Sequence, residues 1–351
     1  MEKKTTYHEQ KDVENILRLR EVLSTLPPFC RAYFRAIDTT TTTKTRISYA
    51  YDIRIFFQFL LDENPAFKDY KMTDFTVDVL DQIKALDLEE YQEYLKVYQA
   101  GDKTETNGER GLKRKISALR SFYAYYYRRE MIETNPTVLI DVPKIHDKSI
   151  IRLDTDEVAL LLDYIEHCGD QLTGQKRVYY EKNKERDLAI VTLLLGTGIR
   201  VSECVGLDIE DVDFKNNGIK VTRKGGNEMV VYFGPEVEKA LKRYLEVREN
   251  IIPLEGHEHA LFYSAQRRRI GVQAIENLVK KYSQQITTTK KITPHKLRST
   301  YGTALYQETG DIYLVADVLG HKDVNTTKKH YAAIDDARRR QAAKAVKLRE
   351  D

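Results

Sequence analysis

The sequence has few cysteines, glycines and prolines, and it has no long apolar run. Its three cysteines, Cys30, Cys168 and Cys204, are widely spaced and odd in number, which excludes a disulfide framework and a zinc-binding pattern. With 17 glycines and 8 prolines in 351 residues, a fibrous or globally disordered chain is excluded as well. The densest apolar run, residues 188–195, is much shorter than the ~18–20 residues of a membrane span. The polar start lacks the apolar core of a secretion signal, so we expect a soluble cytoplasmic protein without a membrane partner.

Net charge is also small, and its distribution is more informative than its sum. The chain has 57 Lys and Arg against 54 Asp and Glu, a formal net charge of +3. One basic cluster is typical of a solvated helix face, whereas five clusters in one chain favour a polyanionic partner. The clusters are Lys113-Arg114-Lys115, Arg267-Arg268-Arg269, Lys290-Lys291, Lys328-Lys329-His330 and Arg338-Arg339-Arg340.

The length and the 41% of hydrophobic residues predict two domains of ordinary size. Residues 1–143 are predicted to form an all-helical domain, with 1–45 as an extra N-terminal segment. The threonine run Thr39 to Thr43 is predicted to be a linker, or a strand too polar to be buried. Apolar residues recur with helical spacing in two strong helices, and more weakly over residues 86–97. The strong stripes are Tyr49, Ile53, Phe56, Phe57 and Leu60, then Leu112, Ile116, Leu119, Tyr123 and Tyr126.

Residues 144–152 are predicted to be a linker, because two prolines precede a polar stretch and disfavour helix before them. The second domain, 153–351, begins with Asp154 and Glu157, spaced as a capping box. It contains the apolar run as a buried helix, then two strands, 219–223 and 228–233, on either side of a glycine-containing hairpin turn. The remainder is predicted to be helical. The fold class is therefore mainly α, with a small antiparallel sheet in the second domain.

Two segments of this domain place charged residues at helix ends. In Gly196-Thr-Gly-Ile-Arg200-Val-Ser-Glu203, a buried helix ends in glycines, and Glu203 is spaced to pair with Arg200 and orient it. In Thr293-Pro-His295-Lys-Leu-Arg298, Thr293 is predicted as the N-cap, so His295 and Arg298 share one face at a helix start that favours anions. Taken alone, each segment is also explained by a structural ion pair or a cap.

Two further segments add a lysine, a histidine and a tyrosine. Lys224 lies at the mouth of the predicted hairpin turn, where a flexible ammonium can reach a phosphate or deliver a proton. Leu319-Gly320-His321 ends a short predicted helix, and Tyr331 lies on the next one. Each of these is common on protein surfaces, and only their combination is specific.

In order and spacing, these residues resemble the active-site set of the tyrosine recombinases. The resemblance extends to the Xer branch and its single-recombinase XerS type through Asn183-Lys-Glu-Arg-Asp-Leu-Ala-Ile190, Val221-Thr-Arg-Lys-Gly-Gly226 and Arg243-Tyr-Leu-Glu-Val-Arg248. It covers the second domain closely and the first in outline. Tyr331 lies ten residues after His321, one more than is usual in the family. An extra residue in the connecting loop accounts for this difference.

The resemblance implies a site-specific DNA recombinase that acts through a 3′-phosphotyrosyl intermediate and a Holliday junction. It implies Tyr331 as nucleophile, Arg200 and Arg298 as clamps on the phosphate, and His321 as a further donor. Lys224 would be the general acid, His295 the proton acceptor, and Glu203 a brace. Neither a metal nor another cofactor is needed.

The resemblance also implies double-stranded DNA as partner and a homotetramer on it, in the bacterial cytoplasm at the nucleoid. The basic tail from about residue 334 would be a helix that docks on a neighbouring protomer. Lys113, Lys115, Arg120 and Arg223 are the predicted DNA contacts. Chromosome dimer resolution, element integration or excision, and inversion all use this chemistry.

Three other functions remain open at the level of sequence. A type IB topoisomerase uses the same chemistry without strand exchange. A DNA-binding protein with a decayed site would bind DNA and never link to it. A metallonuclease would use His257, His259, His295 and His321, although the carboxylate cluster that such a site needs is lacking.

Overall fold

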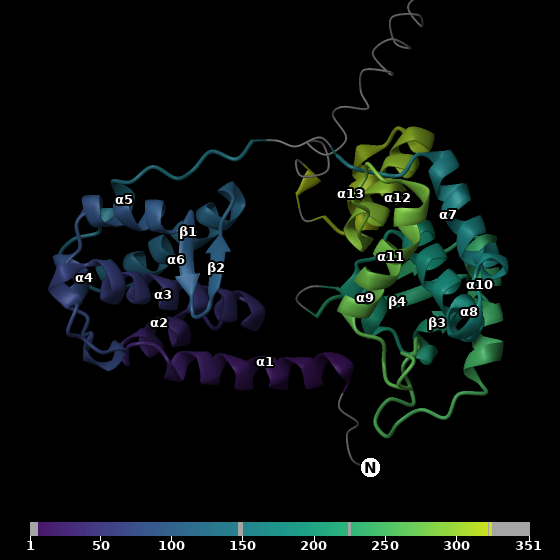
Figure 1. The fold of residues 1–351 in the computed structure, drawn as a ribbon, viewed down its shortest axis with the longest axis horizontal. Coiled ribbons are helices and arrows are strands. Elements are labelled where there is room, and N and C mark those ends of the chain that lie inside the picture. Colours follow the sequence, from purple (N-terminus) through teal and green to yellow (C-terminus); the bar gives the residue numbers. More distant parts are fainter. Residues whose placement is uncertain (1–5, 147–149, 224–225, 322, 325–351) are drawn as a thin grey trace, which may run out of the picture. The chain divides into compact units, whose positions relative to one another are not determined.

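The chain divides into two compact units, Met1–Lys148 and Ser149–Asp351. A computed structural model describes residues 6–146, 150–223, 226–321, 323 and 324. The division falls in the segment 144–152 that the sequence predicts as a linker. Both units are mainly helical and the second contains a small antiparallel sheet, as predicted (Figure 1). Within the described ranges, no helix is both long and apolar enough to cross a membrane.

The first unit packs its helices around one core, rich in aromatic residues. The ring of Phe29 meets that of Tyr126 edge to face, and the ring of Tyr33 meets that of Phe122 in the same way, an arrangement that aromatic quadrupoles favour. The apolar stripes predicted from helical spacing lie on α3 and α6. All of the residues in these stripes are buried except Tyr49, which is half-buried. The elements are α1 (Tyr7–Ser24), α2 (Cys30–Ala36), α3 (Thr43–Glu63), η1 (Pro65–Phe67), η2 (Met72–Asp74), α4 (Val79–Gln82), α5 (Ala85–Tyr94), β1 (Val97–Ala100), β2 (Lys103–Thr106), α6 (Glu109–Tyr127) and η3 (Pro136–Val138).

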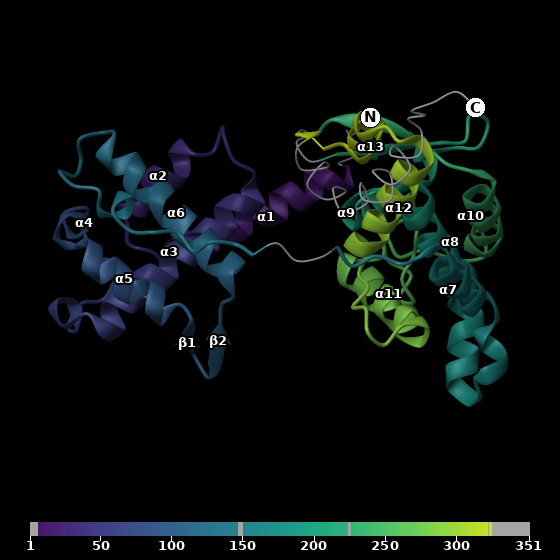
Figure 2. The same ribbon diagram turned by 90° about the horizontal axis from the view of Figure 1, so that it is seen from above.

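Two predictions for the first unit need correction. The threonine run is not a strand: it forms a turn in the connection between α2 and α3, and the Thr42 side chain caps α3 by accepting from the Thr45 amide. The unit is also not all-helical, because β1 and β2 form an antiparallel hairpin that extends beyond the helices (Figure 2). The hairpin is mostly exposed, so it lacks the alternation of buried and exposed residues by which a strand is recognised in sequence.

The second unit is built around α8, which packs against α7, α10 and α12. Residues 188–194 of α8 are buried, which agrees with the predicted buried helix. Asp154 and Glu157 form the predicted capping box at the start of α7. The elements are α7 (Thr155–His167), η4 (Cys168–Gln171), α8 (Gly174–Thr197), α9 (Val201–Gly206), η5 (Ile209–Asp211), β3 (Val212–Asp213), β4 (Gly218–Thr222), β5 (Glu228–Tyr232), α10 (Pro235–Arg248), α11 (Val272–Ile286), α12 (Pro294–Thr309) and α13 (Ile312–Leu319).

The sheet of the second unit has the strand order β3-β4-β5 and is antiparallel throughout. Strands β4 and β5 pair from Gly218 opposite Tyr232 to Thr222 opposite Glu228, close to the predicted hairpin. Arg223 closes this ladder, since its amide donates to the Asn227 carbonyl (2.8 Å).

A buried charge cluster joins α3, α6 and the base of the β1–β2 hairpin in the first unit. Asp52 on α3 is almost fully buried and pairs with Arg114 on α6 (2.6 Å) and more distantly with Lys115 (3.8 Å). The Lys115 ammonium also donates to Asn107 Oδ1 (2.9 Å). Burial raises the pKa of the Asp52 carboxyl to about 6, although Arg114 and Lys115 oppose the rise.

Asp52 makes the stability of the chain depend on pH. The carboxyl has its ordinary pKa near 3.8 in the unfolded chain and a raised pKa in the folded chain, so the folded state binds the proton more tightly. This tighter proton binding stabilises the fold below pH 3.8, and the stabilisation is lost as the pH rises through about 6. In Asp52→Asn it is absent, so we expect the Tm of the variant, relative to wild type, to increase from pH 5 to pH 7 in thermal melts followed by circular dichroism. A relative Tm that decreases over this range would contradict the assignment.

Candidate active site

The site is organised around the last turn of α13. Gly320 ends this helix in the left-handed conformation (φ +62), and the His321 amide donates back to the Ala316 carbonyl (2.9 Å). The final carbonyls of a helix have no donor within the helix itself, and they form the negative end of its dipole. Three arginines from separate elements donate to the carbonyls of residues 317–320: Arg200, Arg223 and Arg298.

Arg298 on α12 is the most deeply buried of the three, with 5% of its surface exposed. Its Nη2 donates to the Leu319 carbonyl, and its Nη1 donates to the Gly198 carbonyl, where α8 ends. Gly198 is left-handed as well (φ +63). Arg298 therefore joins two helix ends that are far apart in sequence.

Arg200 lies directly after the end of α8, at the N-cap of α9. The Glu203 side chain is 4% exposed, and its carboxylate accepts from the Arg200 amide (2.7 Å) and from Arg200 Nη1 (2.8 Å). Nη2 of Arg200 lies 3.4 Å from the Gly320 carbonyl. The Arg200 side chain nevertheless keeps 36% of its surface exposed, so its guanidinium is held in place and still accessible to an anion.

Of the other predicted catalytic residues, the structure describes His295 and His321. His295 is exposed in the first turn of α12, one turn before Arg298, and Thr293 and Pro294 occupy the predicted cap and first position. His321 is half-buried directly after Gly320. Lys224, Tyr331 and the tail from about residue 334 lie outside the described residues. Lys224 follows Arg223 in sequence.

Two of the predicted DNA contacts on α6 instead have partners inside the first unit. Lys115 is buried in the cluster with Asp52 and Asn107. Arg120 is half-buried and donates to the carbonyls of Thr137 (3.0 Å) and Ile140 (2.6 Å). Lys113 is exposed. Helical spacing identified the second strong helix correctly, but the burial of Lys115 was missed.

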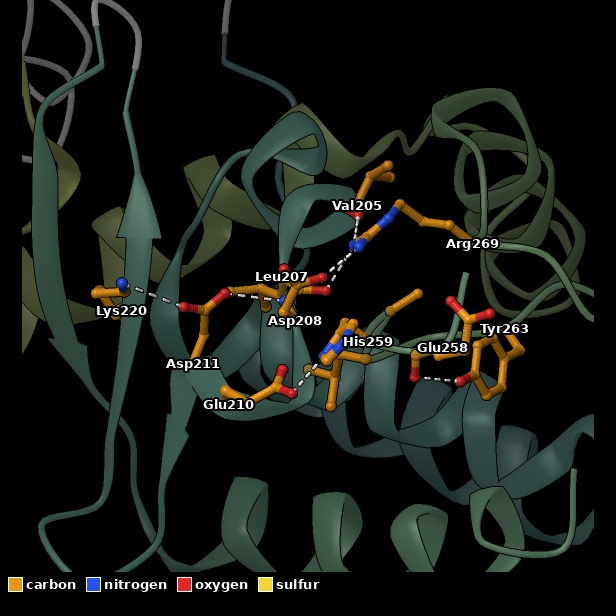
Figure 3. A network of polar contacts seen from close by, with 12 residues as sticks. Val205, Leu207, Asp208, Glu210, Asp211, Lys220, Glu258, His259, Tyr263 and Arg269 are labelled. Carbon is orange, nitrogen blue, oxygen red and sulfur yellow. Dashed lines mark hydrogen bonds and ion pairs between the residues drawn. The ribbon is translucent and has the colours of Figure 1, made fainter. Parts of the chain in front are cut away.

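The sequence interpretation also missed the role of Arg269, taken there as part of a basic cluster. Its Nη1 donates to the carbonyls of Val205 (3.0 Å) and Leu207 (2.7 Å), and its Nη2 pairs with Asp208 (Figure 3). Arg269 thus holds the C-terminal end of α9, the helix that begins at Arg200. Its side chain is 10% exposed, unlike those of its exposed neighbours Arg267 and Arg268.

Acidic residues after α9 extend the same network (Figure 3). Glu210 pairs with His259, one of the histidines considered for a metallonuclease, and Asp211 lies 3.7 Å from Lys220 on β4. The network therefore connects the end of α9 to the sheet whose β4 leads to Arg223. Nothing in the spacing of these residues along the sequence indicates this connection.

Substitution of Gly198 tests how closely the end of α8 must approach the end of α13. A Cβ added there would lie 2.4 Å from the Tyr301 ring and 3.0 Å from Leu319, so Gly198→Ala combines a left-handed penalty with a clash. Gly174 begins the same helix at φ +57 and has nothing within 4 Å of an added Cβ. We expect Gly174→Ala to cost about 1–2 kcal/mol of stability, and Gly198→Ala to cost more, in parallel thermal melts. Equal losses would show that the approach is not tight.

Comparison with known proteins places these residues in a family. The model of the phage integrase family matches residues 152–338. A tyrosine recombinase XerS from Lactococcus lactis subsp. cremoris (strain MG1363) is 32% identical over 350 residues, which cover 92% of this chain and 96% of the relative. A tyrosine recombinase XerC from Caldanaerobacter subterraneus subsp. tengcongensis is 32% identical over 329 residues, covering 90% of this chain and 86% of the relative.

Solved structures have the same fold at lower identity. XerH bound to a palindromic difH substrate, a post-cleavage complex, has a TM-score of 0.62 at 21% identity, covering 86% of this chain and 79% of that one. The Tn1549 transposon integrase in complex with circular intermediate DNA has a TM-score of 0.61 at 21% identity, covering 86% of this chain and 94% of that one. The family match spans more than half of the chain and agrees with the long XerS alignment. The chain therefore belongs to the phage integrase family, in the Xer branch of the tyrosine recombinases, and is similar to the XerS proteins.

Proposed function

We propose that this protein is a site-specific DNA recombinase that cleaves and rejoins duplex DNA through Tyr331. The observation that carries the proposal is the placement of Arg200 and Arg298 on the carbonyls of Gly320 and Leu319, directly before His321. The two guanidiniums reach the same turn from different helices. An anion that binds beside His321 would therefore meet donors that are already oriented.

The chemistry that suits this arrangement is phosphoryl transfer. As the Tyr331 oxygen bonds to phosphorus and the bond to the 5′-oxygen breaks, negative charge accumulates on the non-bridging oxygens. Fixed guanidiniums stabilise this charge, and loss of one such donor typically costs about 3–4 kcal/mol of the barrier, or ~10²- to 10³-fold in rate. Glu203 keeps Arg200 in place, and His321 adds a further donor.

Two proton transfers complete the step. The phenol proton of Tyr331 passes to His295, and Lys224 gives a proton to the departing 5′-oxygen. The products are a 3′-phosphotyrosyl link and a free 5′-hydroxyl. One phosphate ester replaces another, so a 5′-hydroxyl can reverse the reaction without ATP or a metal. Attack by the 5′-hydroxyl of a second duplex exchanges strands and forms a Holliday junction.

The relatives support duplex DNA as the partner, since the Tn1549 integrase structure is named as a complex with circular intermediate DNA and the XerH structure as a recombinase bound to its difH substrate. In the first unit we propose Lys113 as a DNA contact, together with Arg110, its exposed neighbour one turn earlier on α6. Exchange between two sites needs four copies of the chain. The expected place of action is the nucleoid, in chromosome dimer resolution or in integration and excision of an element.

A covalent adduct tests the nucleophile directly. Tyr331→Phe would first select its binding site from genomic fragments, and wild type would then be incubated with that site as a nicked suicide duplex in EDTA. We expect an adduct on a denaturing gel with wild type and none with Tyr331→Phe, at equal binding. As a matched control, Tyr313→Phe alters an exposed tyrosine of α13 and should leave the adduct unchanged.

An adduct with Tyr331→Phe would exclude this nucleophile. Tight binding by wild type without an adduct would favour a DNA-binding protein with a decayed site. Release of supercoils without transfer to a second duplex would favour the topoisomerase alternative.

The tail provides a separate test of assembly. We expect deletion from Ala337 onward to leave binding of one subunit unchanged and to lower cooperative binding of further subunits in a gel-shift titration. The physical reason is that the basic tail would dock on a neighbouring protomer. A full-length variant with Arg338, Arg339 and Arg340 changed to alanine keeps the length of the tail and removes part of its charge, so it shows which of the two the cooperative binding depends on. Unchanged cooperativity in the deletion would contradict the role.

A further inference from the structure

Arg223 connects the β4–β5 hairpin to the end of α13. Its amide and carbonyl hold the hairpin, donating to Asn227 and accepting from Gly226. Its side chain leaves the sheet: Nη2 donates to the Val318 carbonyl (2.7 Å), and Nη1 lies 3.4 Å from the Asp317 carbonyl. One residue thus fixes both the strand that leads into Lys224 and the turn that leads into His321.

Gly320 gives Arg223 the space for this contact. A Cβ at Gly320 would lie 1.5 Å from Nη1 of Arg223 and 2.3 Å from Cζ. The guanidinium therefore occupies the space that a side chain at position 320 would fill. The left-handed backbone at Gly320 would by itself favour glycine, and the contact with Arg223 is a second, independent reason for it.

The arrangement is more than a helix cap. Burial lowers the pKa of Arg223, and the nearby Arg200 lowers it further, while Glu203 opposes the change. Among the described residues, the buried Nε of Arg223 has no hydrogen-bond partner. A buried, unpaired donor beside a second cation costs stability, so stability alone does not account for this residue.

We infer that Arg223 is a positioning residue for cleavage: it fastens the strand that precedes Lys224 to the turn of α13 on which Arg200 and Arg298 also rest. The inference rests on the proposed function and assigns Arg223 a role different from the DNA contact predicted from sequence. The strand before the general acid and the two arginines that clamp the phosphate are then held by the same turn of α13. Loss of Arg223 would mainly impair transfer of the proton from Lys224 to the 5′-oxygen.

A substrate with sulfur at the leaving position distinguishes a role in proton transfer from a role in stabilising the phosphate charge. In a duplex whose bridging 5′-oxygen at the scissile phosphate is replaced by sulfur, the leaving thiolate needs no proton. We expect Arg223→Ala to slow single-turnover cleavage of the ordinary duplex at least tenfold and to cleave the sulfur duplex within about threefold of wild type. An equal loss on both substrates would overturn the assignment, because Arg223 would then act on the phosphate charge. Full activity on the ordinary duplex would overturn it too.

Binding measurements distinguish positioning from a DNA contact. If Arg223 contacted a phosphate, Arg223→Ala would weaken binding and lower the salt slope by about one. The positioning role predicts an unchanged affinity and slope. Arg223→Lys keeps the charge but loses the planar fork, so we expect it to resemble Arg223→Ala in cleavage. Rescue by lysine would overturn the role of the two carbonyl contacts.

A structural readout keeps the inference testable if wild type forms no adduct. Hydrogen exchange of the amides of Gly320 and His321 should become faster in Arg223→Ala whether or not the chain cleaves DNA, and unchanged exchange would overturn the inference. Arg177→Ala is the matched control: it removes an exposed arginine from the first turn of α8, roughly 30 Å along that helix from its end at the site. It should alter neither exchange nor cleavage.

Gly320→Ala provides a second variant that does not remove Arg223. The added methyl group would displace the guanidinium, so we expect slower cleavage of the ordinary duplex, as in Arg223→Ala. In the double variant the methyl group has room, and the combined loss should be smaller than the product of the two single losses. Losses that multiply would show that the two residues act separately.

Discussion

The end of one short helix is the constraint on which the site depends. The last turn of α13 leaves carbonyl oxygens that no amide of the helix can reach, and burying them without donors would destabilise the fold. Three guanidiniums meet this requirement, arriving from α12, from the N-cap of α9 and from the end of β4. The same contacts hold the arginines in fixed orientations. One set of hydrogen bonds therefore both satisfies the helix carbonyls and orients the arginines for the chemistry.

Gathering cations in a partly buried place has an electrostatic cost. Burial lowers the pKa of Arg223, and Arg200 adds to this effect. The buried carboxylate of Glu203 and the negative end of α13 offset part of the repulsion. The remaining positive potential favours an anion, and the exposed part of Arg200 is where one can enter. The arrangement thus exchanges some stability for a site that is already complementary to a phosphate.

Much of the fold and part of the site follow from the sequence, and what does not follow depends on tertiary contacts. The helix at 188–194 and the cap of α7 are local patterns, so spacing predicts them. The pairing of Arg200 with Glu203 is equally local. Lys115 and Arg269 were assigned to basic surfaces because a run of charges shows neither which member is buried nor which carbonyl it contacts. The β1–β2 hairpin escaped prediction because it buries little.

The arginines contact α13 through backbone oxygens, and this affects how the site can change over generations. Every residue type presents the same carbonyl, so substitutions at the exposed Asp317 or the half-buried Val318 leave the hydrogen-bond acceptors in place. Position 320 has no such freedom, because any Cβ would meet Arg223. The surface of this turn can therefore drift, for example to suit a different neighbour, while the chemistry beneath it stays the same.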